Sequence, residues 1–303
     1  METLREKRKK RKRYRALKRV LFAVVILSVA LVGLWMGKTH PLVSRIHLGD
    51  NEVQFHFVDV GQGDAALIRT SEGNILVDAG TGQSEEGLRA YLDDLGIEKI
   101  RYAVFTHPDE DHIGGADTVL RNYDVETVVL PRAEMNTSVA QAMLRAIEQE
   151  QCEVVWAMPK MEFSLGNLTC EILAPLGSDY EETNDLSIVL RVEYGETSVL
   201  FTGDAGEASE RDLVREYGSA PGGALDCDLV KIGHHGSDTS SGQAFLDAVT
   251  PDFGVISCGA GNPHGHPAPT VLRLLQAMGT TVYRTDLDGS VVFSSTGGEP
   301  IKS

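Results

Sequence analysis

The residues best suited to chemistry lie in the segment Thr106–Gly115, which reads THPDEDHIGG. Within six positions it holds two histidines, His107 and His112, and two aspartates, Asp109 and Asp111. Imidazole nitrogens and carboxylate oxygens at this density are the ligands that a divalent metal ion needs. A strand is predicted just before the segment and a helix just after it, so that several side chains converge on one point. We favour a metal site over the alternative, a solvated acidic loop with incidental histidines.

Two further loops concentrate histidines directly after predicted strands. One holds His234 and His235, and the other holds His264 and His266. Six of the nine histidines therefore lie in three loops at strand ends, which is where a sheet scaffold gathers a site. Asp204 follows another hydrophobic strand, which would deliver its carboxylate at a sheet edge. The alternative for an aspartate in that position is an ordinary turn residue.

Additional carboxylates follow strands or precede them. The glycine loop before Asp64 lacks the third glycine of a dinucleotide-binding motif and leads into a strand instead of a helix. We therefore interpret it as a turn whose Asp64 faces the site. Asp78 is expected to orient a metal ligand, not to bind metal itself. Asn184 and Asp185, just before a predicted strand, are further candidates.

The elements that must position these loops alternate between strands and helices. Strands are predicted at residues 52–60, 64–70, 74–80, 100–105, 126–130, 153–156, 168–173, 186–194, 198–202, 229–232, 253–257, 281–284 and 290–293. Helices are predicted at residues 85–95, 116–123, 207–217, 243–249 and 268–278, and one capped by Thr137 or Ser138 runs to about residue 150. Tight glycine turns join the first three strands, which indicates antiparallel pairing. The pattern predicts an α+β domain in which two sheets pack together with helices outside.

The N-terminal segment differs in composition from the rest. Residues 1–19 hold eleven lysines or arginines and two glutamates, and residues 20–36 carry no charge. Seventeen apolar residues are at the lower end of what spans a bilayer, and the basic flank belongs on the cytoplasmic side. We expect a basic cytoplasmic tail (1–19), a single transmembrane anchor in the cell membrane (20–37), a linker (38–51) and an extracytoplasmic domain (52–303). The alternatives are a cleaved signal peptide, which gives a secreted protein, and a nucleic-acid-binding tail.

Charge and cysteine content bound the partners of the domain. The chain has 28 basic and 44 acidic residues; residues 20–303 keep 17 and 42 of them, a formal charge of −25. An acidic surface repels polyanions, which weighs against tight nucleic-acid binding but leaves hydrolysis of a phosphodiester open. The four cysteines lack CxxC spacing, which argues against a zinc knuckle. Their pairing and the oligomeric state stay open.

Six segments in a fixed order carry a family resemblance: FHFVDVGQGDAALI, LVDAG, THPDEDHIGG, LFTGD, KIGHHGS and GNPHGHP. Over roughly residues 52–295 they resemble the metallo-β-lactamase-fold domain of ComEC-type competence proteins. The resemblance implies an αββα sandwich with a metal site in the cleft at its edge. In those proteins the domain accompanies a multi-helix DNA channel and is thought to act as a nuclease on the strand that is not imported. With one predicted membrane segment here, that role does not carry over intact.

The resemblance also implies a ligand set. Its metal ligands would be His107, Asp109, Asp111, His112, Asp204, His235 and His266. Asp109 stands where the wider fold has its second histidine, and Asp204 falls on the bridging carboxylate. The later histidine falls on His235 (or His234) or on His266, which are all candidates, and the middle one is absent, with Asn184 near its place. One or two divalent ions are implied, and the added carboxylate shifts preference toward Mn²⁺ or Mg²⁺ relative to Zn²⁺.

This set predicts a membrane-anchored, metal-dependent hydrolase of ester bonds, with a phosphodiester as substrate and DNA as one candidate. Asp111 is the candidate for ligand or base. Lys231, or His234 if His235 binds metal, is expected to neutralise a phosphate oxygen. The alternatives are hydrolysis of a cell-wall or lipid head-group phosphoester, a thiol- or lactam-directed hydrolase, and a module that binds metal without turnover.

Overall fold

The computed structural model of the protein describes residues 48–49 and 51–303. These residues belong to one structural unit, which begins at residue 47 and continues to the C-terminus. The predicted basic tail and membrane anchor lie outside the described residues. Within the part of the chain that is described, no helix has both the length and the apolar composition to cross a bilayer.

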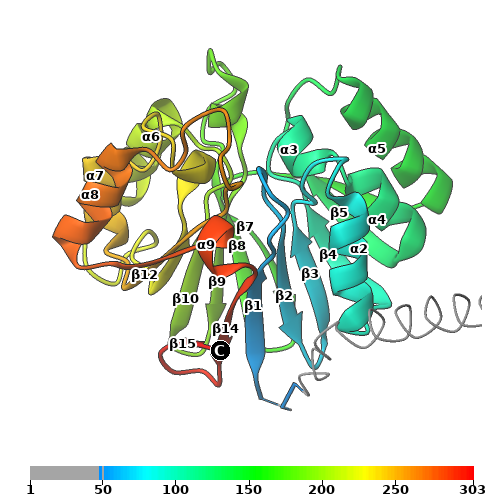
Figure 1. The fold of residues 1–303 in the computed structure, drawn as a ribbon, viewed down its shortest axis with the longest axis horizontal. Coiled ribbons are helices and arrows are strands. Elements are labelled where there is room, and N and C mark those ends of the chain that lie inside the picture. Colours follow the sequence, from blue (N-terminus) through cyan, green and yellow to red (C-terminus); the bar gives the residue numbers. More distant parts are fainter. Residues whose placement is uncertain (1–47, 50) are drawn as a thin grey trace, which may run out of the picture. The chain divides into compact units, whose positions relative to one another are not determined.

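Two β-sheets form the centre of this unit (Figure 1). The strands of the first sheet are β1 (Val53–Phe57), β2 (Ala66–Thr70), β3 (Gly73–Val77), β4 (Lys99–Val104), β5 (Asp124–Leu130), β6 (Glu153–Trp156), β14 (Val291–Ser295) and β15 (Ile301–Lys302). Their order across the sheet is β15-β14-β1-β2-β3-β4-β5-β6. The pairs β1–β2 and β2–β3 are antiparallel, which confirms the prediction from the glycine turns. From β3 to β6 the strands run parallel.

The second sheet is built from the C-terminal half of the domain. Its strands are β7 (Met161–Leu165), β8 (Leu168–Ala174), β9 (Val189–Tyr194), β10 (Thr197–Phe201), β11 (Leu229–Lys231), β12 (Phe253–Ile256) and β13 (Thr281–Arg284). Their order is β13-β12-β11-β10-β9-β8-β7, and β10 to β13 run parallel. The edge strand β7 was not predicted, and β9 begins three residues later than the strand predicted at residues 186–194. Just before β9, the 3-10 helix η1 (Thr183–Leu186) occupies the start of that range.

Helices cover the outer faces of both sheets. They are α2 (Glu85–Asp94), α3 (Glu110–Ile113), α4 (Ala116–Asn122), α5 (Ser138–Glu150), α6 (Glu207–Tyr217), α7 (Gln243–Val249), α8 (Pro269–Met278) and α9 (Thr285–Asp288), together with the 3-10 helix η2 (Gly233–Gly236). Figure 1 shows α2, α4 and α5 outside the first sheet and α6, α7 and α8 outside the second. The Thr137 side chain accepts a hydrogen bond from Ala140 N, which confirms the predicted cap of α5. These layers confirm the predicted αββα sandwich.

Apolar side chains fill the space between the two sheets. Phe57 on β1 and Phe201 on β10 stack there with ring centroids 5.7 Å apart, and both side chains are buried. Two further apolar clusters lie under the helices, one against each sheet. All four cysteines of the chain are free thiols, so the fold depends on this packing and not on disulfides.

The strand directions bring the predicted loops together. Since β3 and β4 are parallel, Asp78 and His107 emerge at the same edge of the first sheet. In the second sheet β10, β11 and β12 are parallel, so Asp204, His235 and His266 all follow carboxyl ends of neighbouring strands. The carboxyl edges of both sheets therefore supply the residues of one centre.

Candidate metal centre

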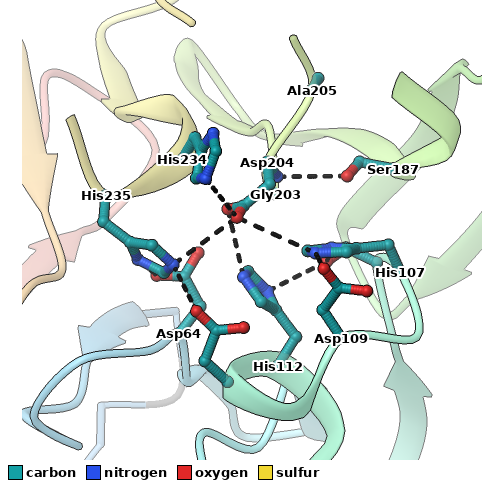
Figure 2. A network of polar contacts seen from close by, with 12 residues as sticks. Asp64, His107, Asp109, His112, Ser187, Gly203, Asp204, Ala205, His234 and His235 are labelled. Carbon is teal, nitrogen blue, oxygen red and sulfur yellow. Dashed lines mark hydrogen bonds and ion pairs between the residues drawn. The ribbon is translucent and has the colours of Figure 1, made fainter. Parts of the chain in front are cut away.

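Two histidines and two aspartates from distant parts of the chain form a buried cluster. One ligand atom from each of Asp64, His112, Asp204 and His235 lies within 4.8 Å of the others. Figure 2 shows Asp204 at the middle of this group, with histidine rings directed at its carboxylate. The four side chains reach this point from the loops and short helices that connect the strands of both sheets.

The carboxylate of Asp204 contacts four imidazoles. Its Oδ1 lies 3.1 Å from His112 Nε2. Its Oδ2 lies 3.9 Å from His107 Nε2 and 3.6 Å from Nε2 of both His234 and His235. The Asp204 backbone N–H donates to Ser187 Oγ at 3.2 Å, which holds the loop in place. This position between both groups of histidines is the one that a bridging carboxylate requires.

The segment Thr106–Gly115 contributes side chains from the residues before the short helix α3 and from the helix itself. Asp109 precedes α3, and its Oδ2 lies 3.8 Å from His107 Nε2, with about half of the side chain exposed. Asp111 and His112 lie within α3, whose existence the sequence did not reveal. Asp111 Oδ2 lies 3.1 Å from His235 Nε2, which links the loops of the two sheets.

Asp78 and Thr106 orient His112. The carboxylate oxygen Oδ2 of Asp78 lies 2.8 Å from His112 Nδ1, and the backbone N–H and the hydroxyl of Thr106 both donate to Asp78 at 2.7 Å. This contact fixes the orientation of the ring, so that Nε2 of His112 faces the cluster. This contact agrees with the orienting role expected for Asp78.

Replacing Asp78 by alanine is expected to weaken metal binding about 10- to 100-fold, because such carboxylates fix the ring and its tautomer. Equilibrium dialysis followed by metal analysis measures the effect. Asp93, an exposed aspartate on α2 that hydrogen-bonds Tyr123, supplies the control Asp93→Ala, which should bind metal as the unmodified protein does. Equal affinity in Asp78→Ala would contradict the orienting role.

The paired histidines adopt an unusual backbone conformation. His234 and His235 have φ angles of 48° and 54°, in the left-handed region. For residues other than glycine this conformation costs on the order of 1–3 kcal/mol and is concentrated at functional sites. It directs both neighbouring rings toward Asp204. His235 Nδ1 donates to Ser257 O at 3.0 Å, which leaves its Nε2 facing the cluster.

His234 and His266 lie at the rim of the centre. His234 is about a quarter exposed, and its Nδ1 is 3.0 Å from Thr239 Oγ1. The ring of His266 lies 5.5 Å from that of His234 and 6.4 Å from that of His235. Asn262 holds the His266 backbone through its side-chain amide, which fixes the loop. His266 therefore borders the cluster but is not one of its four buried members.

The charges of the cluster depend on one another. Burial, followed by the positive charge of His112, lowers the pKa of His107 to about 3, so its imidazole is neutral and its nitrogen can donate electrons. Burial opposes the charge of His235, but Asp204, Asp64 and Asp111 raise its pKa to about 9. Although burial raises the pKa of Asp204, the histidines, His112 foremost, hold it well below its usual range. The carboxylates thus stabilise positive charge at this point.

A divalent metal ion fits this donor set. Six side-chain atoms among the described residues are buried without a hydrogen-bond partner, and four of them belong to this centre: His107 Nε2, His112 Nε2, Asp204 Oδ1 and Asp64 Oδ1. The other two are His266 Nδ1, at the rim, and the hydroxyl of Ser209. Unpaired buried polar atoms are costly, and the four atoms of the centre are imidazole nitrogens or carboxylate oxygens. These are the ligand types of Zn²⁺ and Mn²⁺, and a divalent ion supplies the charge that the carboxylates demand.

Among the predicted residues that are not members of the four buried ligand-type side chains are Lys231, Asn184 and Asp185. Lys231 was expected to face a substrate, but its side chain is 4% exposed and its Nζ lies 2.6 Å from Asp64 Oδ2. Asp185 accepts a hydrogen bond from Ser209 N outside the cluster, and Asn184 lines a neighbouring cleft. Asp64 was expected to face the site but was not predicted as a metal ligand, and it is one of the four buried ligand-type side chains. The only sequence feature that pointed to it was the glycine turn before β2.

A cleft of about 860 Å³ opens beside His234. The acidic residues that line it are Asp179, Glu181, Glu182, Asp185, Glu207 and Asp238. Among the described residues of its lining, Arg211 is the one lysine or arginine. Substrate reaching the centre past His234 would therefore pass a predominantly negative surface.

Comparisons with known proteins agree with this arrangement. Residues 58–260 match the family described as the Metallo-beta-lactamase superfamily. ComE operon protein 3 of Bacillus subtilis (strain 168) is 28% identical over 80% of this chain and 33% of its own length. Competence protein ComA of Neisseria gonorrhoeae is 32% identical over 80% of this chain and 32% of its own. The chain thus spans about a third of these relatives.

A solved structure shows the same fold. The metallo-beta-lactamase fold protein YhfI from Bacillus subtilis superposes with a TM-score of 0.55 at 12% identity, over 80% of this chain and all of that one. At this identity the likeness concerns the fold alone. From the family match, the relatives and the buried cluster, the chain belongs to the metallo-beta-lactamase superfamily of metal-dependent hydrolases and resembles the hydrolase domain of ComEC-type proteins.

Proposed function

We propose that this protein is a metal-dependent phosphodiesterase. The observation that carries the proposal is the buried cluster, which contains as many carboxylates as imidazoles. Asp204 lies at its middle, between the histidines of the first sheet and those of the second. Oxygen ligands harden a site and suit metal ions that bind phosphate oxygens. The residues that would hold one or two divalent ions, Mn²⁺ or Zn²⁺ with Mg²⁺ as an alternative, are His107, Asp109, Asp111, His112, Asp204 and His235, with His266 at the rim.

A divalent ion held by these residues would supply Lewis-acid chemistry, lowering the pKa of water to about 7 and polarising the ester. The chain's own residues supply the remaining functions. Asp111 is about one-third exposed and carries an oxygen beside His235, where it can accept a proton. His234 is accessible at the mouth of the cleft, so its Nε2 is the group that we assign to a phosphate oxygen. Lys231 is committed to Asp64 and is less suited to that role.

The cleft favours one class of phosphodiester over another. Its acidic lining repels a long polyanion, and one arginine offers little compensation. A small or zwitterionic phosphodiester, such as a lipid head group or a cell-wall phosphoester, avoids this repulsion. DNA remains the candidate that the resemblance to ComEC-type competence proteins implies. An anchor at residues 20–37, with the domain outside the cytoplasm, would place the centre at a membrane surface. That location would suit a lipid head-group or cell-wall phosphoester as the substrate.

A substrate panel tests the proposal. We expect the purified protein with Mn²⁺ to hydrolyse bis(p-nitrophenyl) phosphate and glycerophosphocholine, and Asp111→Ala to lose both activities. The rate of single-stranded DNA cleavage should be lower than the rates on the small substrates. This difference should shrink as added salt screens the charge of the cleft. Hydrolysis of a β-lactam or thioester without any phosphodiester would overturn the proposal. If the protein binds metal but hydrolyses no ester, the alternative of a metal-binding module without turnover would be correct.

A further inference from the structure

A buried carboxylate beside the centre is not explained by the ligand pattern of the superfamily. Asp64 follows the turn Gly61-Gln62-Gly63 and is 5% exposed. Its Oδ2 pairs with Lys231 Nζ, while its Oδ1 lies 3.3 Å from His235 Nδ1 and has no hydrogen-bond partner. His235 Nδ1 already donates to Ser257 O. One oxygen of Asp64 is thus held in place, and the other lies beside the His235 ring without a hydrogen bond.

The backbone fixes the position of this carboxylate. The Asp64 N–H donates to Asp111 O at 3.0 Å, and its carbonyl accepts from Gly80 N at 2.7 Å. Gly63 has a φ angle of 151°, and a Cβ there would lie 2.5 Å from Asp111 O. Only glycine permits so close an approach. The turn is therefore packed against α3, the element that carries Asp111 and His112, and Asp64 cannot move independently of these ligands.

Lys231 explains only one of the two carboxylate oxygens. Its ammonium is buried on β11 and also donates to Ile232 O at 2.9 Å, so it requires a negative partner. A salt bridge alone would be satisfied by Oδ2. A carboxylate oxygen of Asp64 also lies within 4.8 Å of ligand atoms of His112, Asp204 and His235, and the pair with Lys231 does not require that proximity. A bound cation would be the missing partner of this buried carboxylate oxygen.

We propose that Asp64 is a metal ligand, which together with His112, Asp204 and His235 forms a four-residue site held by residues of both sheets. Lys231 offsets the extra negative charge and keeps Oδ2 out of the cluster, so that Oδ1 faces the ion. The inference rests on the metal centre of the proposed function but not on its substrate. It adds a ligand that precedes the THPDEDH segment by more than forty residues in the chain.

The test compares two variants that both lack the salt bridge. Asp64→Asn alone would strand the Lys231 ammonium, so the informative pair is Lys231→Met and the double variant Asp64→Asn/Lys231→Met. Mn²⁺ affinity and stoichiometry are measured by isothermal titration calorimetry, and thermal unfolding in chelator verifies that both fold. We expect the double variant to bind at least about 100-fold more weakly than Lys231→Met, because a ligand matters no less than the groups that orient one. Equal affinities would overturn the proposal.

A measurement on the unmodified protein needs no folded variant. Anomalous scattering from Mn²⁺-soaked crystals locates the ion directly. The proposal predicts an Asp64 oxygen at a coordinating distance, about 2.0–2.6 Å for oxygen ligands, and a separation beyond that range overturns it. If the protein binds Mn²⁺ at His107 and Asp109 but not at Asp64, this inference fails and the proposed function stands. If it binds no divalent ion at all, both fail.

Discussion

Replacing Asp204 by alanine is expected to lower phosphodiesterase activity at least about a thousand-fold. Its two oxygens contact His112 on one side and His107, His234 and His235 on the other. Because it is the carboxylate common to both groups, its loss should release bound metal. Metal-ion catalysis contributes several kcal/mol to the transition state, and about 4 kcal/mol corresponds to a thousand-fold in rate. Steady-state kinetics on bis(p-nitrophenyl) phosphate, with metal content of the same sample, measure both effects.

Asp228 provides the matched control for this experiment. Its carboxylate accepts hydrogen bonds from the backbone and hydroxyl of Ser198, at the amino end of β10 and β11 and therefore at the opposite edge from the centre. Asp228→Ala should lower stability but keep full metal content and the normal rate per folded molecule. An Asp204→Ala protein that retains both metal and rate would contradict the assignment of Asp204.

Replacing Phe201 by alanine is expected to lower the free energy of unfolding by about 3–5 kcal/mol, the usual cost of removing a buried phenyl ring. Phe201 is 2% exposed and stacks on Phe57 between the two sheets, three residues before Asp204. A cavity there would loosen the packing of β10 that positions Asp204. Urea unfolding measures the change in free energy, and metal titration shows whether the affinity falls with it.

Leu287 supplies the comparison for Phe201. It is 70% exposed on α9, so Leu287→Ala should change stability by no more than about 0.5 kcal/mol. A Phe201→Ala protein within that same margin would show that the interface between the sheets does not carry the stability assigned to it.

Much of the fold is predictable because its strands are strongly apolar runs ending at polar loops. The segments before Asp204 and His235 are largely or fully buried in β10 and β11, and the segment before His107 is buried over the last two residues of β4. Short apolar runs bounded by turn residues are strand signals. Parallel neighbours then bring such loop residues to one edge without any further assumption. Local pattern and strand direction together predict most of the centre.

The remainder depends on contacts that no local pattern contains. The edge strand β7 is an exception, because its five residues alternate apolar with polar side chains, which is a strand pattern that the prediction omitted. Lys231 lies in a three-residue strand that is buried throughout, and only the tertiary position of Asp64 explains an inward-facing lysine. The approach of Gly63 to Asp111 joins segments that are distant in sequence. Such pairings follow from the packing of the two sheets.

The most direct test of the metal-dependent phosphodiesterase uses one preparation of the protein in three states. Metal content and the rate on bis(p-nitrophenyl) phosphate are measured as purified, after chelation and dialysis, and after adding Mn²⁺. We predict that the rate falls with the metal content and returns with Mn²⁺, because the cluster around Asp204 has no substitute for a divalent ion. A metal-free protein that hydrolyses the phosphodiester at its full rate would contradict the central claim.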